Sequence, residues 1–235
     1  MKLFRGFRQQ LIQDKNLKKY LLYAIGEILL VMIGILLAFQ VDNWNEEREK
    51  KITEIKIYKN IRDQIIGDKE LIQSQIDYNN HYMVQFEFAK ELILTNDRTK
   101  MDTLGIIVSK LTNYSDFDRE GNIYETLVNG GQMQLLRNQR IINRVRWLEE
   151  RYNYVNRMEN IHYDVMMKFA APNLTSAVNF VSAKVIDPDL VFSNEFQNLV
   201  FLLLEIMQEK EQTYNAAIKE IDEILVLIDE ELKPN

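Results

Sequence analysis

The chain has 235 residues, a net charge of −6 and no cysteine, which excludes a disulfide framework, a thiol nucleophile and a zinc–thiolate site. Residues 1–20 carry +5 and residues 42–235 carry −10, and this acidic body argues against a nucleic-acid partner. Only 8 Gly and 3 Pro, with abundant Leu, Ile, Glu and Lys, predict an all-α fold.

The basic segment 1–19 precedes a long apolar run. Within the basic segment, residues 3–17 place Leu3, Phe4 and Phe7 on one side, which is compatible with an interfacial helix or with a plain positive flank of the membrane anchor. Because positive flanks stay cytoplasmic, we expect the N-terminus inside a bacterial inner membrane and the body in the periplasm.

Residues 20–41 read YLLYAIGEILLVMIGILLAFQV, with Glu27 as the only charge between Leu21 and Phe39. A helix of this length covers about 30 Å, the thickness of a bilayer core. A buried soluble helix is rarely so long and uniformly apolar, and a cleaved signal peptide has a shorter apolar region. The run predicts a transmembrane helix whose interfacial anchors are Lys18, Lys19, Tyr20 and Trp44.

One face of this predicted helix carries Glu27, Gly34 and Ala38. Small residues four apart allow a second helix to approach closely, and a carboxylate facing lipid is costly. We interpret the three residues as a helix-association face, in a homo-oligomer or with another membrane protein. An ion or proton relay at Glu27 is the alternative, disfavoured because a lone carboxylate lacks an intramembrane partner.

The run from Lys19 to Arg48, KYLLYAIGEILLVMIGILLAFQVDNWNEER, resembles the N-terminal signature of a family of small Bacteroidota membrane proteins, a domain of unknown function. Tyr124 to Ile141, YETLVNGGQMQLLRNQRI, is similar to that family's second block, a helix, a glycine break and a helix. The resemblance implies an integral-membrane, mostly helical protein. It brings no established activity and no catalytic residues.

The body, residues 42–235, is predicted to be a bundle of long helices. The first helix is expected to continue from the membrane to about Asn96, because no Pro interrupts its apolar periodicity. A short helix near Asp102–Leu111, a loop at 113–122, and a helix from Ile123 that stops at Asn129-Gly130-Gly131 follow.

Two further long helices show apolar seams with steps of three and four. One runs from about Asn138 to Ala171, ends before Pro172 and has the seam Ile141, Val145, Leu148, Tyr152, Val155, Glu159, His162, Met166, Phe169. The other runs from about Ser193 to Leu232 and has the seam Phe196, Val200, Leu203, Met207, Lys210, Tyr214, Ala217, Ile221, Ile224, Ile228.

The pair that comes nearest to metal chemistry is Glu159 and His162, half of a di-metal carboxylate motif, which Asp77 and His81 could face. A complete site needs two such pairs and two further Glu, and the chain has only two histidines. A polar pair that fixes helix register is the favoured interpretation. Residues 116–122 lack the spacing of a calcium loop and are read as a solvated acidic loop.

We therefore predict no metal site, no catalytic residues and no cofactor. The expected function is that of a non-enzymatic scaffold, accessory subunit or sensor-like binding module acting through the extracytoplasmic bundle. A subunit of an ion-driven membrane complex that uses Glu27 is the first alternative, and a metal-dependent bundle enzyme is the second.

Overall fold

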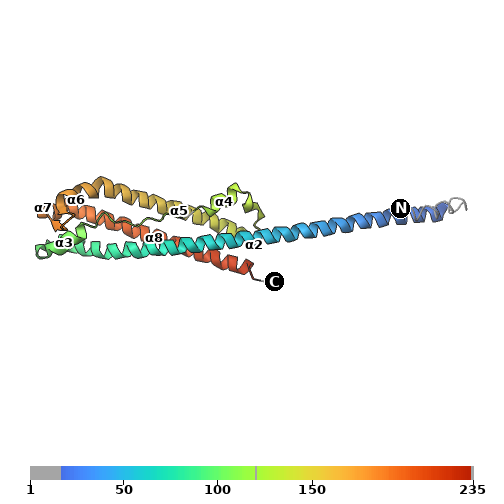
Figure 1. Ribbon diagram of the computed structural model, residues 1–235, viewed down its shortest axis with the longest axis horizontal. Coiled ribbons are helices and arrows are strands. Elements are labelled where there is room, and N and C mark those ends of the chain that lie inside the picture. The colour runs from blue at the N-terminus through green and yellow to red at the C-terminus, as the bar shows by residue number, and fades with distance from the viewer. Residues whose placement is uncertain (1–16, 120, 234–235) are drawn as a thin grey trace. The chain divides into compact units, whose positions relative to one another are not determined.

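The computed structural model describes residues 17–119 and 121–233 (Figure 1). It is 83% helical with almost no strand, so the prediction of an all-α fold is confirmed. The chain divides into two compact units, residues 1–53 and residues 54–235, and each is described by itself.

Helix α2 (Leu17–Leu94) is 78 residues long and runs from the first unit into the second. Proline is absent from it, and surface pairs such as Glu46–Lys50, 2.7 Å apart, support its charged middle. Asn96 follows with φ 49°, a left-handed conformation that asparagine tolerates and that closes helix ends. The expected continuous helix to about Asn96 is thus confirmed.

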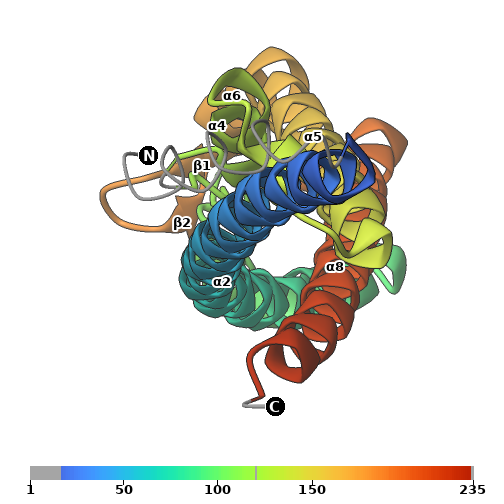
Figure 2. The same cartoon turned by 90° about the vertical axis from the view of Figure 1, so that its right-hand side faces the viewer.

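The second unit is built on three long helices: α2 from Glu54 onward, α5 (Gln139–Val165) and α8 (Asn194–Glu231) (Figures 1 and 2). Helices α5 and α8 begin where the sequence supplies a cap. The Asn138 side chain accepts from the amides of Arg140 and Ile141, and the Ser193 hydroxyl accepts from the amide of Phe196. These helices form the predicted bundle.

Helix α8 runs antiparallel to α2, as polar contacts along their seam show. Arg62 meets Asp229 at 3.0 Å and Lys69 meets Asp222 at 2.5 Å, while Asn79 Nδ2 donates to the carbonyl of Met207 at 3.0 Å. All ten residues of the predicted α8 seam are buried. The hydrophobic period of this helix therefore predicted the centre of its buried face. Further buried residues flank that centre: Leu199, Leu204, Ile206, Thr213 and Leu227.

The end of α5 differs from the prediction. A π-helical turn, η3 (Met166–Ala170), and helix α6 (Ala171–Ala177) continue it, so the expected stop before Pro172 is wrong. Proline is tolerated in the first turn of α6, where it need not donate. The wide turn also shifts the seam by one residue: Ala170 is fully buried and Phe169 is 55% exposed, whereas the sequence placed Phe169 inward.

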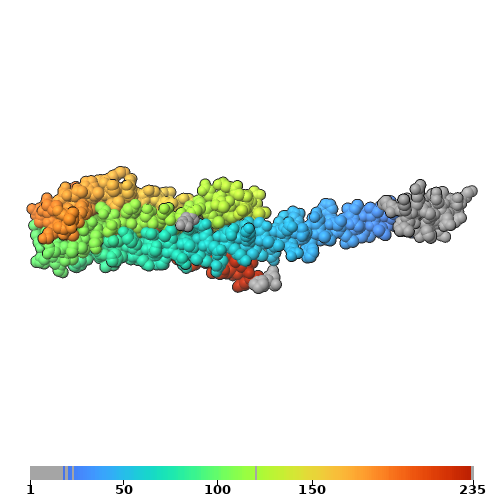
Figure 3. Space-filling view, in the orientation of Figure 1, coloured from blue at the N-terminus to red at the C-terminus, as the bar shows by residue number. Residues whose placement is uncertain are grey.

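Short elements connect the long helices. These are η1 (Arg98–Lys100), α3 (Met101–Val108), α4 (Ile123–Asn129), η2 (Gln132–Leu135), the hairpin β1 (Val178–Asn179) and β2 (Lys184–Val185), and α7 (Pro188–Val191). Helices α6 and α7 lie at the end of the bundle where α2 ends (Figure 1), and the orange colour of this part of the chain marks the same end in the space-filling view (Figure 3). Gly105 of α3 is required there, because a Cβ would come within 2.3 Å of the carbonyl oxygen of Ala183.

Candidate functional site

No described residue in the apolar part of α2 is buried. Its most apolar 18-residue window has a mean hydropathy of 2.3, and none of that window is buried inside the protein. Within the described ranges, α2 is the one helix long and apolar enough to cross a membrane, by length and composition. The apolar stretch lies near the N-terminus, where the sequence predicted the membrane segment.

The residues of the predicted association face lie on this exposed stretch. A Cβ at Gly34 would meet nothing within 4 Å, Ala38 is exposed and Glu27 is half-buried. Trp44, one of the predicted anchors, is 69% exposed. Lys18, another anchor, is exposed as well, while the side chains of Lys19 and Tyr20 lie outside the described residues. Roles in helix association and anchoring stay predictions.

A buried polar cluster lies in the second unit, around residues 113–119, which we call the clasped segment. The segment has no regular secondary structure, with Ser115 and Phe117 buried and Asp116 and Asp118 exposed. The prediction of a solvated acidic loop therefore holds for the two aspartates and fails for Phe117, which lies between them.

Each long helix contributes one side chain to the backbone of the clasped segment. Gln75 of α2 accepts from the amide of Asp116 at 2.9 Å, and Glu159 of α5 accepts from the amide of Phe117 at 2.7 Å. Lys210 of α8 donates to the carbonyl of Ser115 at 2.5 Å. Buried backbone groups that helices cannot pair are thus satisfied by side chains.

Glu159 and Lys210 belong to a connected set of buried groups. The hydroxyl of Tyr214 donates to Glu159 and also lies 3.3 Å from Ser115 Oγ. Burial raises the pKa of the Glu159 carboxyl, against hydrogen bonds from Tyr214 and Phe117 that favour the charged form. Burial also lowers the pKa of Lys210 to about 8, although Glu159 and Asp116 oppose that shift.

His162 is completely buried beside this pair. Its Nδ1 lies 3.5 Å from Lys210 Nζ, and its ring packs edge-on against Tyr114, with ring centroids 5.7 Å apart. An ammonium only donates, so Nδ1 is the acceptor and the imidazole proton sits on Nε2. Nε2 has no hydrogen-bond partner among the described residues. Burial, with a smaller contribution from Lys210, lowers the pKa of His162 to about 3.

The metal interpretation does not fit this geometry. Glu159 and His162 do face the same seam, but His81 is exposed beside Gln85 and Asp77 is bonded to Gln73 on the surface. No group of three or more His, Cys, Asp or Glu residues that could hold a metal ion occurs in the part of the chain that the structure describes. The cation next to Glu159 and His162 is the ammonium of Lys210.

A second cluster fixes the end of the clasped segment. Arg119 makes a two-pronged pair with Glu149 of α5, at 2.7 and 2.8 Å, and its guanidinium lies 4.8 Å from the centroid of the Tyr152 ring. The hydroxyl of Tyr152 donates to Asp68 of α2 at 2.9 Å. Sequence reasoning missed this cluster, although Arg119 is the single cation in an otherwise acidic loop.

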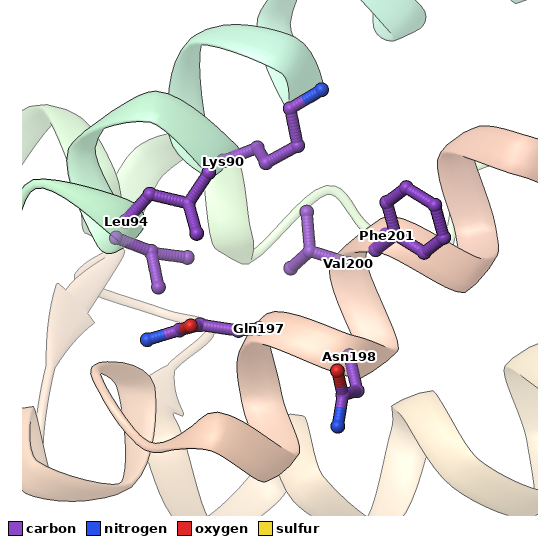
Figure 4. A pocket seen from close by; sticks show the side chains of 7 residues that line it. Lys90, Leu94, Gln197, Asn198, Val200 and Phe201 are labelled. Carbon is purple, nitrogen blue, oxygen red and sulfur yellow. The ribbon is translucent and has the colours of Figure 1, made fainter.

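A groove elsewhere on the second unit encloses about 300 Å³. Figure 4 shows Lys90 and Leu94 of α2 with Gln197, Asn198 and Phe201 of α8 along it. None of the buried charged residues described above lines this groove. It is therefore separate from the polar cluster.

Comparison with curated proteins and with solved structures gave no match. A family model described as a family of unknown function, DUF6090, matches residues 27–207. The match includes the second half of the apolar stretch, all of α5 and the clasped segment, which together carry most of the features described above. With more than half of its length matched, the chain belongs to the DUF6090 family, whose function is unknown.

Proposed function

We propose that this protein is a single-pass inner-membrane protein that acts by binding, as a scaffold or accessory subunit, through its helical body. The observation that carries the proposal is the exposed apolar window of α2. Burying one large aliphatic side chain contributes roughly 1.5–3 kcal/mol, so a stretch of this composition is not stable in water. A bilayer supplies the apolar surroundings that the chain does not supply itself.

The buried charged groups support a binding role rather than catalysis. Glu159 and Lys210 are bonded to backbone atoms of the clasped segment, and Arg119 is paired with Glu149. These groups hold the bundle together, and the groove between Lys90 and Phe201 contains none of them. Glu159, Lys210 and Arg119, whose pKa values are perturbed, are thus occupied by structural contacts.

Assembly in the membrane is expected to use Glu27, Gly34 and Ala38. The test is extraction from native membranes in mild detergent, followed by mass measurement of the intact complex and identification of its components. Gly34→Leu should lower the assembled mass, because a large side chain separates the helix backbones. Gly26→Leu is the matched control, since Gly26 is equally open but lies about 100° around the helix from Glu27.

A protein that stays monomeric in the membrane, with Gly34→Leu unchanged in mass, would contradict the assembly role. Glu27→Gln separates the contact from the ion-driven alternative. Loss of the complex in this variant supports a contact. An intact complex that loses an ion-dependent activity would favour the alternative.

A further inference from the structure

The titratable groups linked to His162 come from α5, α8 and the clasped segment. Lys210 of α8 and Tyr114 of the clasped segment contact the ring directly. Glu159 of α5 interacts in turn with Lys210, with Tyr214 of α8 and with Asp116 of the clasped segment. The nearest charge to the His162 ring that affects its pKa is the ammonium of Lys210.

The groups around His162 do not stabilise its protonated form. Its Nδ1–H would point at an ammonium 3.5 Å away, and Nε2–H already lacks an acceptor. The nearby Glu159 carboxylate is engaged by the amide of Phe117 and the hydroxyl of Tyr214. An imidazolium here would be a buried cation with no compensating partner.

The clasped segment covers this ring. Tyr114 packs on His162, and the carbonyl of Ser115 binds the same ammonium that contacts His162. Water can reach the ring and stabilise its charged form when these two residues move away. Protonation of His162 and release of the segment are therefore coupled.

We propose that His162 is an acid-sensitive latch: the clasped segment is held in the bundle while His162 is neutral and is released when His162 takes up a proton. Release would expose the buried face of Phe117 and free Glu159 and Lys210 from the backbone. The inference rests on the second unit alone and does not depend on the proposed function.

The direction of the pH effect on closure follows from the lowered pKa of His162, which is about 3 in the closed state and 6.5 when the ring is in water. The open state binds more protons between these two values, so closure weakens as pH falls through that window. The protonation of His162 by itself raises the opening equilibrium about 25-fold between pH 7 and pH 5. Glu159 acts in the opposite sense, because its raised pKa makes the closed state take up its proton first.

Hydrogen–deuterium exchange of the full-length protein in detergent tests the latch. After correction for intrinsic exchange rates, peptides covering residues 113–119 should lose protection between pH 7 and pH 5, relative to peptides from the middle of α8. His162→Gln, which keeps an uncharged polar group, should abolish that loss. His81→Gln is the matched control, because His81 is the only other histidine and is exposed; it should behave as the wild type.

NMR titration of the two labelled histidines covers the case in which His162→Gln fails to fold. His162 should stay neutral until the segment exchanges. Unchanged protection of residues 113–119 at pH 5 would overturn the proposal. So would a His162 that titrates near pH 6.5 while the segment remains protected.

Discussion

At the scale of single residues, Lys210 is a side chain that is costly to bury, because its ammonium loses its contact with water; it is 1% exposed. Two charges removed from water are tolerated only when their remaining hydrogen-bonding groups are satisfied. Lys210 meets that condition through Ser115, and Glu159 meets it through Phe117 and Tyr214. The burial of Lys210 and Glu159 thus depends on the clasped segment, which supplies hydrogen-bond partners that their own helices do not.

Replacing Lys210 tests this dependence. Lys210→Met should destabilise the fold by about 3 kcal/mol, because it leaves the Glu159 charge and the Ser115 carbonyl buried without their partner. Lys69→Met is the control: Lys69 is also paired at 2.5 Å, with Asp222, but both side chains are more than a third exposed, so about 1 kcal/mol or less is expected. Urea unfolding of the two variants gives the comparison, and equal losses would contradict this interpretation.

At the scale of elements, the π-helical turn sets which residues face the core. It lets Ala170 and Leu174 point inward after His162 and Met166, although regular helical spacing would turn Phe169 inward. A π turn contains one residue more than the corresponding turn of an α-helix. The exposed Phe169 is the residue whose removal restores regular spacing.

Deletion of Phe169 should therefore be tolerated, with a melting temperature within a few degrees of the wild type by circular dichroism. Ala170 would take the position three residues after Met166 and stay inward. Deletion of Arg151, an exposed residue in the regular part of α5, should abolish cooperative unfolding, because every later residue of α5 would turn by about 100°. Equal sensitivity of the two deletions would show that the π turn has another role.

Helices were predictable because their signal repeats over many turns, as the ten buried residues of the α8 seam illustrate. The clasped segment was not, because its alternation of Ser115 and Phe117 with Asp116 and Asp118 lasts only a few residues and is masked by acidic composition. For the candidate site, Glu159, His162 and Lys210 were identified as seam positions. The binding of Glu159 and Lys210 to one loop backbone was not predictable, because it depends on contacts between residues that are 42 and 95 positions apart.

At the scale of the whole molecule, the two units have opposite chemistry. The stretch near the N-terminus is apolar and exposed, and residues 54–235 have their own buried core. The core has two clusters, and α8 contributes to both. This division leads to a prediction about topology.

Because the chain has no cysteine, single introduced cysteines report the side of the membrane without background. Ser74→Cys, at an exposed position of the second unit, should react with a membrane-impermeant maleimide in spheroplasts. Lys2→Cys should react only after the membrane is opened, because the basic flank is expected to stay cytoplasmic. Labelling of Lys2→Cys in intact spheroplasts would reverse the proposed orientation.

The pairing of α2 with α8 also constrains when the chain can fold during its synthesis. Arg62 and Asp229 are 167 residues apart in the chain, and the buried isoleucines of α2, such as Ile61 and Ile65, share a core cluster with the last turns of α8. A growing polypeptide that has completed α2 cannot yet bury that face, since its partner has not been translated. This face of α2 must therefore stay uncovered, and be shielded from aggregation, until α8 has left the ribosome.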